Sequence, residues 1–191
     1  MNNTTIADVP LPKSYLLLNH GPTVLVSSAA AGRRNVMAAA WAMPLDFDPP
    51  KVLVVIDRNT VTRGLVEASG EFALNVPCRA QASQALAAGS SSARDLPPTQ
   101  DKFAACGLET FAAGRIGAPL VAGCVAWLEC RVVREPHNEG AYDLFIGEVV
   151  SAAAAADAFS DGRWHFPDAA RRTIHYQAGG QFFATGESFP A

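Results

Sequence analysis

The sequence predicts a mainly β protein with short helices, built as a β-barrel that carries its helices at one edge. Short apolar runs bounded by glycine or proline outnumber the segments with helical periodicity. Hydrophobic residues make up 49% of the 191 residues, which is enough to bury a substantial core. No internal repeat is evident and no second domain is needed, so we expect one domain over residues 1–191.

The first half of the chain supplies four expected strands. The apolar run Val24–Ser27 follows Gly-Pro and precedes a turn-like segment, which predicts the first barrel strand. Asn35–Met43 is expected to be the second strand. The β-branched run Val52–Ile56 predicts a strand buried on both faces, and Glu71–Val76 lies between a glycine and a proline, as strands often do.

Helices are expected at two places. Val61–Ser69 has apolar residues at helical spacing and is followed by Gly70 as a stop signal. The alanine-rich segment Arg79–Ala88 also predicts a helix, which leads into a flexible connection at Gly89–Ala93.

The second half predicts two long strands, Cys124–Arg134 and Tyr142–Ala153. The segment Pro136–Gly140 between them is interpreted as a hairpin loop. After it the chain alternates turns with short segments, which completes a barrel with helices inserted at its edge.

Charge and cysteine usage exclude several classes of partner. The formal net charge is −3 and the basic residues are scattered, so nucleic acid is not an expected partner. No apolar run approaches the roughly 18 residues of a membrane span, and the first residues lack the features of a signal peptide, so we expect a cytoplasmic protein without membrane contact. The spacing of the cysteines and histidines predicts buried, reduced thiols and no metal site.

The polar block Asp57–Arg63 follows one expected strand and begins an expected helix. Unpaired N–H groups and the positive end of the helix dipole favour an anion there, and arginine adds planar, permanently charged donors. The alternative is an ordinary strand-to-helix turn, with Asn59 or Thr60 as the N-cap and two solvated arginines.

The preceding block Asn35–Pro44 is unusual for its run of small residues. Ala38, Ala39 and Ala40 stand between Met37 and Trp41, so a flat ring could approach the backbone N–H groups. The alternative is a tightly packed interior strand. Rossmann, P-loop and α/β-hydrolase signatures are all missing, which removes the commonest nucleotide-binding and hydrolase folds.

Five motifs in a fixed order carry a resemblance to a known family. They are NVMAAAWAMPLDFDPPKVLVVI, DRNTVTRGLVEASGEFALNVP, DKF at Asp101–Phe103, YDLFIGEVV at Tyr142–Val150 with FSDGRW at Phe159–Trp164, and IHYQAGG at Ile174–Gly180. In these segments, which span most of its length, the chain resembles the flavin reductase-like family of the FMN-binding split-barrel fold, and within it the flavoredoxin-type branch.

The resemblance implies a split β-barrel with FMN as cofactor and a definite set of binding residues. It places the isoalloxazine against Asn35, Met37, Ala38 and Ala39, with Trp41 close by, and the phosphate on Arg58, Thr60, Thr62 and Arg63. Lys102 would lie near the flavin or the phosphate, unless it is simply solvated. His175 keeps a position late in the barrel, as a possible catalytic residue or a structural one.

The resemblance also implies a homodimer with the flavin near the interface. In the leading interpretation NAD(P)H delivers a hydride to flavin N5, and the reduced flavin passes electrons to an acceptor. Tyr142 stands where many reductases of this family carry a histidine, which leaves nicotinamide use open. The alternatives are a flavoredoxin-like electron carrier that is reduced by a redox partner protein, and a flavin-free barrel that binds another small ligand.

Overall fold

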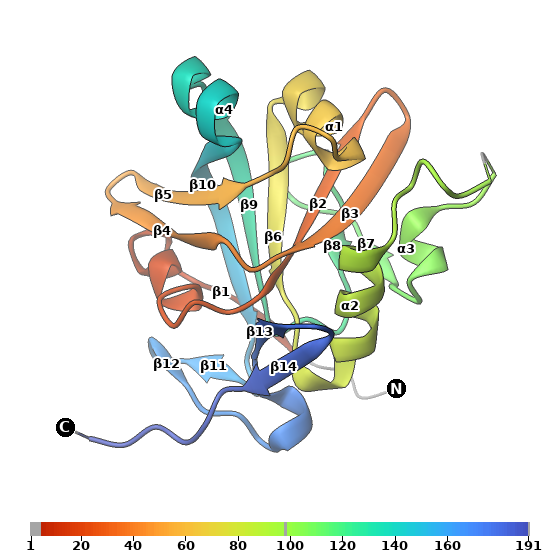
Figure 1. Cartoon of the computed structure of the whole chain (residues 1–191). Coiled ribbons are helices and arrows are strands. Elements are labelled where there is room, and N and C mark those ends of the chain that lie inside the picture. The colour runs from red at the N-terminus through yellow and green to blue at the C-terminus, as the bar shows by residue number, and fades with distance from the viewer. Residues whose placement is uncertain (1–4, 98, 191) are drawn as a thin grey trace.

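The computed structural model describes residues 5–97 and 99–190, and its main feature is one eight-stranded antiparallel sheet (Figure 1). Seven strands follow the order β3-β2-β6-β9-β10-β5-β4, and β1 pairs with β10. Their bounds are β1 (Ile6–Asp8), β2 (Val24–Ala30), β3 (Arg33–Ala39), β4 (Ala42–Phe47), β5 (Pro50–Val55), β6 (Glu71–Val76), β9 (Ala126–Val133) and β10 (Leu144–Ala155).

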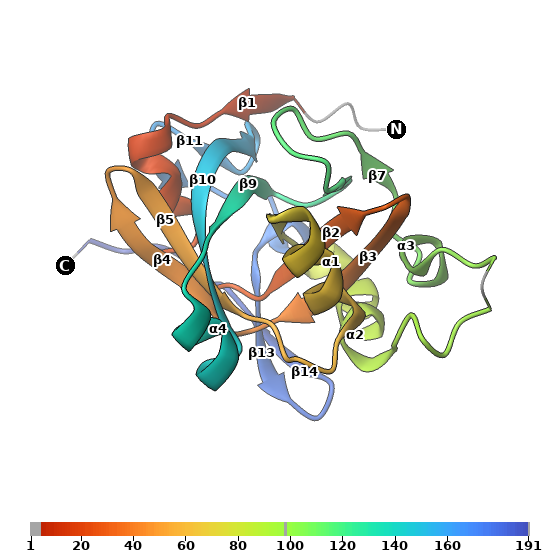
Figure 2. The same ribbon diagram turned by 90° about the horizontal axis from the view of Figure 1, so that it is seen from above.

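The sheet curves into a barrel that is split between its two end strands, β3 and β4. Seen from above, the strands surround the interior of the barrel, and α1 (Val61–Ser69) lies across the end of the barrel that faces the viewer (Figure 2). Outside this sheet, the described residues also form three small hairpins and three short 3-10 turns. They are β7–β8 (Thr110–Phe111 and Leu120–Val121), β11–β12 (Phe159–Ser160 and Arg163–Trp164), β13–β14 (Ile174–Ala178 and Gln181–Ala184), η1 (Leu11–Leu17), η2 (Arg79–Gln81) and η3 (Ala169–Arg171). The mainly β, split-barrel fold class is therefore confirmed.

The helices are short and their ends have clear local causes. At the start of α1, Thr60 Oγ1 accepts a hydrogen bond from the Arg63 amide, and Gly70 ends the helix with a φ of 71°. The others are α2 (Ala82–Ser90), α3 (Lys102–Ala105) and α4 (Pro136–Tyr142). No helix in the described part of the chain is long and apolar enough to cross a membrane.

The small-residue segment is not the single strand that we predicted over Asn35–Met43. It divides into β3 and β4 with a break at Ala40–Trp41. The reason is tertiary, because β3 pairs with β2 while β4 pairs with β5, at opposite ends of the sheet. The chain has to leave one end of the sheet and start again at the other.

The expected hairpin loop Pro136–Gly140 is also wrong, because this segment forms α4. Proline is well suited to the first turn of a helix. The Glu139 carboxylate accepts a hydrogen bond from the Glu135 amide at 2.9 Å and forms an ion pair with Arg134 at 3.2 Å. These two contacts close the turn. Asp143 then ends the helix with a φ of 55°, and β10 begins at Leu144.

Other expected elements fit more closely. The strands predicted at Val24–Ser27 and Glu71–Val76 and the helix at Val61–Ser69 are confirmed as β2, β6 and α1. The helix expected at Arg79–Ala88 begins only at Ala82, after η2. The strand predicted at Val52–Ile56 is β5, but it is not buried on both faces, because its burial alternates.

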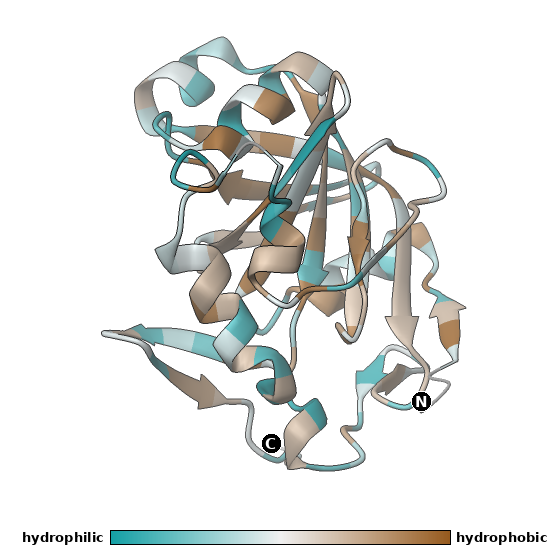
Figure 3. Cartoon of the chain, turned by 90° about the vertical axis from the view of Figure 1, so that its right-hand side faces the viewer, coloured by the Kyte–Doolittle hydropathy of each residue, from teal (hydrophilic) through white to brown (hydrophobic). Residues whose placement is uncertain are grey.

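The core lies inside the curved sheet, and hydrophobic residues follow the strands (Figure 3). Phe72, Leu74, Leu128 and Phe145 are fully buried there. Gly147 on β10 is required by this packing, because a Cβ at that position would lie 2.4 Å from the Phe72 ring. All four cysteines are free and buried, as predicted.

Candidate functional site

The candidate site begins at β3, the end strand on one side of the split. β3 is hydrogen-bonded to β2 alone, so alternate N–H and C=O groups along its other edge have no partner strand. Ala38 and Ala39 carry only methyl groups there, and the chain continues through Ala40 to Trp41. A ligand can therefore reach the backbone of this edge.

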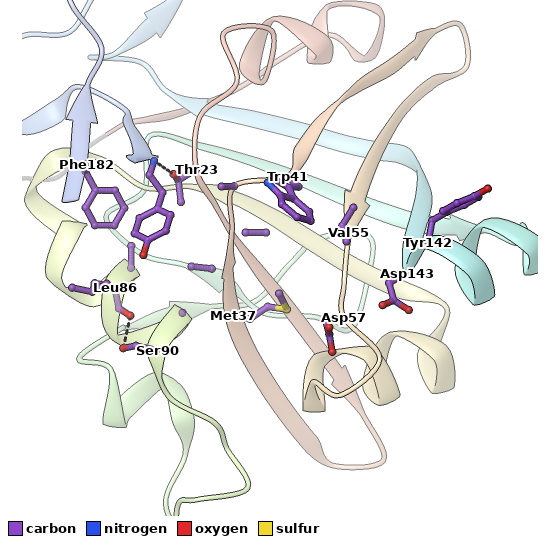
Figure 4. Close-up of a pocket in the computed structure, with 16 residues that line it drawn as sticks. Thr23, Met37, Trp41, Val55, Asp57, Leu86, Ser90, Tyr142, Asp143 and Phe182 are labelled. Atoms are coloured by element: carbon purple, nitrogen blue, oxygen red, sulfur yellow. Dashed lines mark hydrogen bonds between the residues drawn. The ribbon is translucent and has the colours of Figure 1, made fainter. Parts of the chain in front are cut away.

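A cavity of about 540 Å³ runs along this edge, which is a typical volume for a small-molecule site. Figure 4 shows its lining from Phe182 at one end, past Met37 and Trp41, to Tyr142 and Asp143 at the other. The walls come from the β3–β4 connection, from α2, from the β13–β14 hairpin and from the segment around the end of α4.

The α2 wall depends on a glycine. A Cβ on Gly89 would lie 3.2 Å from the Cβ of Ala38, so two small residues let α2 pack closely against β3. The β13–β14 hairpin leans on the same helix, because a Cβ on Gly180 would lie 3.6 Å from Leu86. These contacts fix the distance from α2 to β3 and to the β13–β14 hairpin, and so the width of the cavity at its Phe182 end.

Aromatic side chains stand on three sides of the cavity. Trp41 and Tyr142 are 73% and 63% exposed, and both lie at its mouth. In the hairpin the rings of Tyr176 and Phe182 pack edge to face, with their centroids 5.3 Å apart. This arrangement is suited to a flat, largely apolar ligand.

The other end of the cavity is charged and organised around Asp143. Its Oδ1 accepts hydrogen bonds from Arg63 Nη1 at 3.0 Å and Arg58 Nε at 3.2 Å. Desolvation opposes ionisation of Asp143, but the hydrogen bonds from Arg58 and Arg63 outweigh it and lower the pKa of this carboxyl group. Asp143 is therefore an ionised anchor for both guanidinium groups.

Arg58 and Arg63 differ in how many of their guanidinium N–H donors are already bonded to the protein. Arg63 is buried, and its guanidinium also donates to the Glu67 carboxylate at 2.6 Å and to the carbonyls of Ile56 and Glu139 at 3.2 and 2.9 Å. Arg58 has a side chain that is 59% exposed, and its Nη1 has no hydrogen-bond partner among the described residues. Arg58 is the guanidinium that can take a ligand without losing its own contacts.

The polar residues at the start of α1 connect this helix to β3. Asn35 Nδ2 donates to Thr62 Oγ1 at 2.8 Å, and both residues are buried. Asn35 Oδ1 is buried without a hydrogen-bond partner in the described part of the chain. Thr60 caps the helix, and neither Asn35 nor Thr62 lines the cavity.

Lys102 lies away from the cavity lining, at the end of α2. Its Nζ donates to the carbonyl oxygens of Ala88 and Ser91 at 3.0 and 2.8 Å, and the residue is 4% exposed. Burial lowers the pKa of Lys102. A cation in this position satisfies the last carbonyl groups of the helix, so Lys102 supports the wall that α2 forms.

His175 is held by hydrogen bonds on both ring nitrogens. Nδ1 lies 3.0 Å from the Gly21 carbonyl oxygen and Nε2 lies 3.1 Å from Thr185 Oγ1. Because a carbonyl oxygen only accepts, Nδ1 donates and Nε2 accepts from Thr185 when the ring is neutral. His175 does not line the cavity, although its neighbour Tyr176 does.

The structure thus brings Met37, Ala38, Ala39 and Trp41 together in the cavity lining. Arg58 and Arg63 contact Asp143 at the charged end but are not part of the lining, and Thr60, Thr62, Asn35, His175 and Lys102 also lie outside it. Sequence reasoning missed the α2 wall, the hairpin aromatics and Asp143, because these come from distant segments. The described residues contain no group of three or more metal-ligating side chains.

Comparison with known proteins gives this geometry its context. The family model described as "Flavin reductase like domain" matches residues 17–177. Protein YddH of Escherichia coli is 44% identical over 186 residues, covering 96% of both chains. The NADH-dependent FAD reductase of Streptomyces globisporus is 31% identical over 152 residues, covering 76% of this chain and 80% of that protein.

Two solved structures agree with the fold. The crystal structure of an FMN-binding domain of a flavin reductase-like enzyme from Shewanella baltica superposes with a TM-score of 0.95, at 49% identity and with full coverage of both chains. The flavoredoxin of Desulfovibrio vulgaris superposes with a TM-score of 0.75, at 26% identity over 90% of both chains. The chain belongs to the flavin reductase-like family.

Proposed function

We propose that this protein binds FMN in the cavity along β3 and acts as a flavin-dependent oxidoreductase. The observation that carries the proposal is the unpaired edge of β3, where small residues face an aromatic cavity that ends beside two arginines. Backbone N–H groups on such an edge suit the carbonyl oxygens and nitrogens of an isoalloxazine. The similarity to the Shewanella structure, an FMN-binding domain, supports the choice of flavin.

The proposed roles divide the site residues into two groups. Met37, Ala38 and Ala39 lie along the ring, with Trp41 beside it, and Arg58, just before α1, receives the phosphate. Thr60 caps α1, and its hydroxyl proton is already donated to the Asp57 carbonyl oxygen. The second group holds this frame in place. Its members are Arg63, which ties α1 to α4, Asn35 and Thr62, which tie α1 to β3, and Lys102, which holds the end of α2.

The proposed reaction is NAD(P)H-dependent reduction of the flavin. Bound FMN supplies hydride acceptance, so the protein needs to contribute position and electrostatics more than acid–base groups. The N–H groups of β3 would favour negative charge on the ring, and the α2 and hairpin walls exclude water from it. Similarity to the NADH-dependent FAD reductase of Streptomyces globisporus supports this activity, and the cytoplasm, which holds the NAD(P)H pool, is the proposed location.

A second candidate is an electron carrier that a redox partner protein reduces. The observation that favours it is Tyr142, which lies exposed at the mouth of the cavity where many reductases carry a histidine. The structural similarity to the Desulfovibrio flavoredoxin supports the same alternative.

We also propose that the protein is a homodimer with the flavin near the interface. β4 is an end strand, and Trp41 just before it, together with Met43, Leu45 and Phe47 within it, are 47% to 73% exposed. Unpartnered apolar strips of this kind are typical of interaction surfaces. Trp41 belongs both to this strip and to the cavity lining, which would bring the second copy close to the flavin.

The test is an anaerobic titration of the FMN-loaded protein with NADH and with NADPH. A visible flavin spectrum on the protein is expected first, followed by its bleaching at stoichiometric nucleotide. A spectrum that neither nucleotide bleaches, but that a chemical reductant does, would replace the reductase by the electron carrier. A protein that binds no FMN would contradict both.

A further inference from the structure

The β13–β14 hairpin is a separate two-stranded sheet below the main sheet (Figure 1). It nevertheless forms one wall of the cavity through Tyr176 and Phe182. Two main-chain groups attach it to the barrel: the Thr23 amide donates to the Ile174 carbonyl oxygen at 2.8 Å, and the Tyr176 amide donates to Thr23 Oγ1 at 2.8 Å. Because a two-stranded hairpin is only marginally stable alone, its position depends on the few contacts of this kind.

A chain of four side chains also joins the hairpin to the barrel. His20 Nε2 lies 2.8 Å from Thr173 Oγ1. The Thr173 hydroxyl is hydrogen-bonded to that of Thr185, whose Oγ1 lies 3.1 Å from His175 Nε2. His20 precedes β2, whereas the other three residues lie in β13 or directly beside the hairpin strands. The chain therefore crosses from the barrel to the hairpin.

The chain has a single direction when both rings are neutral. His175 Nδ1 must donate to the Gly21 carbonyl oxygen at 3.0 Å, so its Nε2 accepts the Thr185 hydroxyl proton. Because each hydroxyl has one proton, Thr185 accepts from Thr173, and Thr173 accepts from His20 Nε2. The remaining nitrogen, His20 Nδ1, carries a lone pair and is buried without a partner among the described residues.

A proton on His175 reverses this direction. Both of its ring nitrogens then donate, so the Thr185 hydroxyl has to give its proton to Thr173, its other partner in the described part of the chain. The Thr173 proton then either has no acceptor among the described residues or goes to His20 Nε2, which requires His20 to carry its own proton on the buried Nδ1. Either result leaves a buried donor unpaired, which is unfavourable.

The groups around this chain do not remove the effect. Burial, with a smaller contribution from His175, lowers the pKa of His20 to about 4, so the His20 ring is neutral in weak acid. Arg172 and Glu187 form an ion pair at 3.7 Å beside the chain, and their opposite charges act against each other at His175. The remaining titratable side chains on the adjoining segments are Tyr176 and Cys78.

We propose that His20, Thr173, Thr185 and His175 form a proton-sensitive lock, which holds the β13–β14 hairpin on the barrel while His175 is neutral and loosens it when His175 takes up a proton. Because the hairpin is a wall of the cavity, acidification then opens the cavity on this side. The consequence for FMN rests on the proposed function, whereas the lock itself requires no flavin.

Nitrogen NMR of the imidazole side chains tests the lock, because it shows which ring nitrogen carries the proton. At pH 8 we expect the proton of His175 on Nδ1 and that of His20 on Nε2. As His175 takes up a second proton toward pH 5.5, the His20 resonances should shift with the same midpoint. Over this range amide hydrogen exchange in β13 and β14, corrected for its intrinsic pH dependence, should accelerate about ten-fold relative to β9.

Variants then interrupt the chain at one point. Thr185→Val keeps the side-chain shape but removes the hydroxyl, so His20 should no longer respond to His175, and Thr185→Ser should retain the response. Ser160→Ala is the matched control, because it removes a hydroxyl that lies 2.8 Å from His165 Nε2 in the β11–β12 hairpin. His175→Gln should abolish the pH dependence of hairpin exchange. If Thr185→Val does not fold, the wild-type titration and His175→Gln decide.

Four results would overturn the proposal. They are a His20 proton on Nδ1 at pH 8, His20 resonances that do not follow His175, hairpin exchange that keeps the same ratio to β9 at both pH values, and a Thr185→Val response equal to that of the wild type. FMN should bind about ten-fold more weakly at pH 5.5 than at pH 8 in the wild type but not in His175→Gln. A protein that takes up no FMN would remove the proposed function, while the NMR titration of that same protein would still decide this one.

Discussion

At the scale of single residues, the site shows that two arginines of the same motif have different tasks. Arg63 is buried with four protein acceptors and lies 4.6 Å over the Phe145 ring, so it organises the junction of α1, α4 and β10. Removing it would take this donor from the Ile56 and Glu139 carbonyl groups and leave Asp143 with Arg58 alone, at a cost of about 3 kcal/mol in the free energy of unfolding. Arg58 has a free donor and an exposed side chain. The phosphate contact is therefore better tested at Arg58.

Arg58→Ala should weaken FMN by about ten-fold and leave the affinity for riboflavin almost unchanged. The expected loss is that of one charge-assisted hydrogen bond in a partly exposed position, about 1.5 kcal/mol. Flavin fluorescence titrations of both ligands measure it. Arg131→Ala is the control, because that arginine is about equally exposed but pairs with Glu71, whereas Arg58 pairs with Asp143 at the charged end of the cavity. Equal losses for FMN and riboflavin would remove Arg58 from the phosphate site.

His20 is a second residue whose environment makes a measurable prediction. Desolvation by burial, with a smaller contribution from His175, lowers the pKa of His20 from 6.5 to about 4. Its Nε2 lies 2.8 Å from Thr173 Oγ1, and its Nδ1 is buried without a partner among the described residues. The folded protein thus holds this ring neutral where the unfolded chain would protonate it.

Acidification should therefore destabilise the protein through His20. Its folded pKa lies below its unfolded pKa, so the unfolded state binds more protons, and stability is lost as pH falls from about 6.5 toward 4, by up to about 3 kcal/mol. His20→Gln should abolish this part of the pH dependence in urea unfolding at pH 7 and pH 4, whereas His137→Gln, at an exposed position, should not. If the wild type and His20→Gln lose the same free energy of unfolding between pH 7 and pH 4, His20 is not the group responsible for the acid destabilisation.

At the scale of elements, the sequence predicted correctly those helices and strands whose ends are set by residues within or next to the same segment. The helix at Val61–Ser69 was predictable because its cap and its glycine stop lie in its own sequence. The break between β3 and β4 was not, because it depends on which strands pair at the two ends of the sheet. For α4, the Pro-initiated turn is held by Glu139 within the segment, a signal that the hairpin interpretation overlooked. The binding strand could be found from its small residues, but the walls facing it belong to segments more than about 40 residues away, such as α2.

The packing of α2 on β3 predicts that Gly89 controls flavin access. Gly89→Leu should lower FMN affinity at least ten-fold, because a side chain there collides with Ala38 or occupies the cavity. Gly64→Leu in α1 is the matched control, since a Cβ at Gly64 meets nothing within 4 Å. Thermal melting should show about 0.5–1 kcal/mol of stabilisation for Gly64→Leu from helix propensity, and less for Gly89→Leu. Equal FMN affinity in both variants would show that α2 does not border the flavin.

At the scale of the whole molecule, the chain exposes more surface than one compact protein of its size. Its accessible surface is 9766 Å², whereas a monomer of 20.1 kDa is expected to expose about 8,700 Å². The exposed strip Trp41, Met43, Leu45 and Phe47 and the extended segment after β14 both contribute to the difference. A standard interface buries about 800 Å² on each partner, so the surplus is of the size that one dimer contact would cover.

Light scattering during size exclusion should therefore give a mass near 40 kDa, twice the 20.1 kDa of the chain. Leu45→Lys should shift this to the monomer mass, because a charge in the middle of the strip would have to be desolvated at the interface. Ile6→Lys is the matched control: Ile6 is 46% exposed and Leu45 is 47% exposed, but Ile6 lies on β1, outside the strip. If the flavin lies at the interface, Leu45→Lys should also lose FMN affinity, and Ile6→Lys should retain it. A wild-type mass near 20 kDa with FMN bound would exclude both the dimer and the interfacial site, whereas a Leu45→Lys dimer would place the contact on another surface.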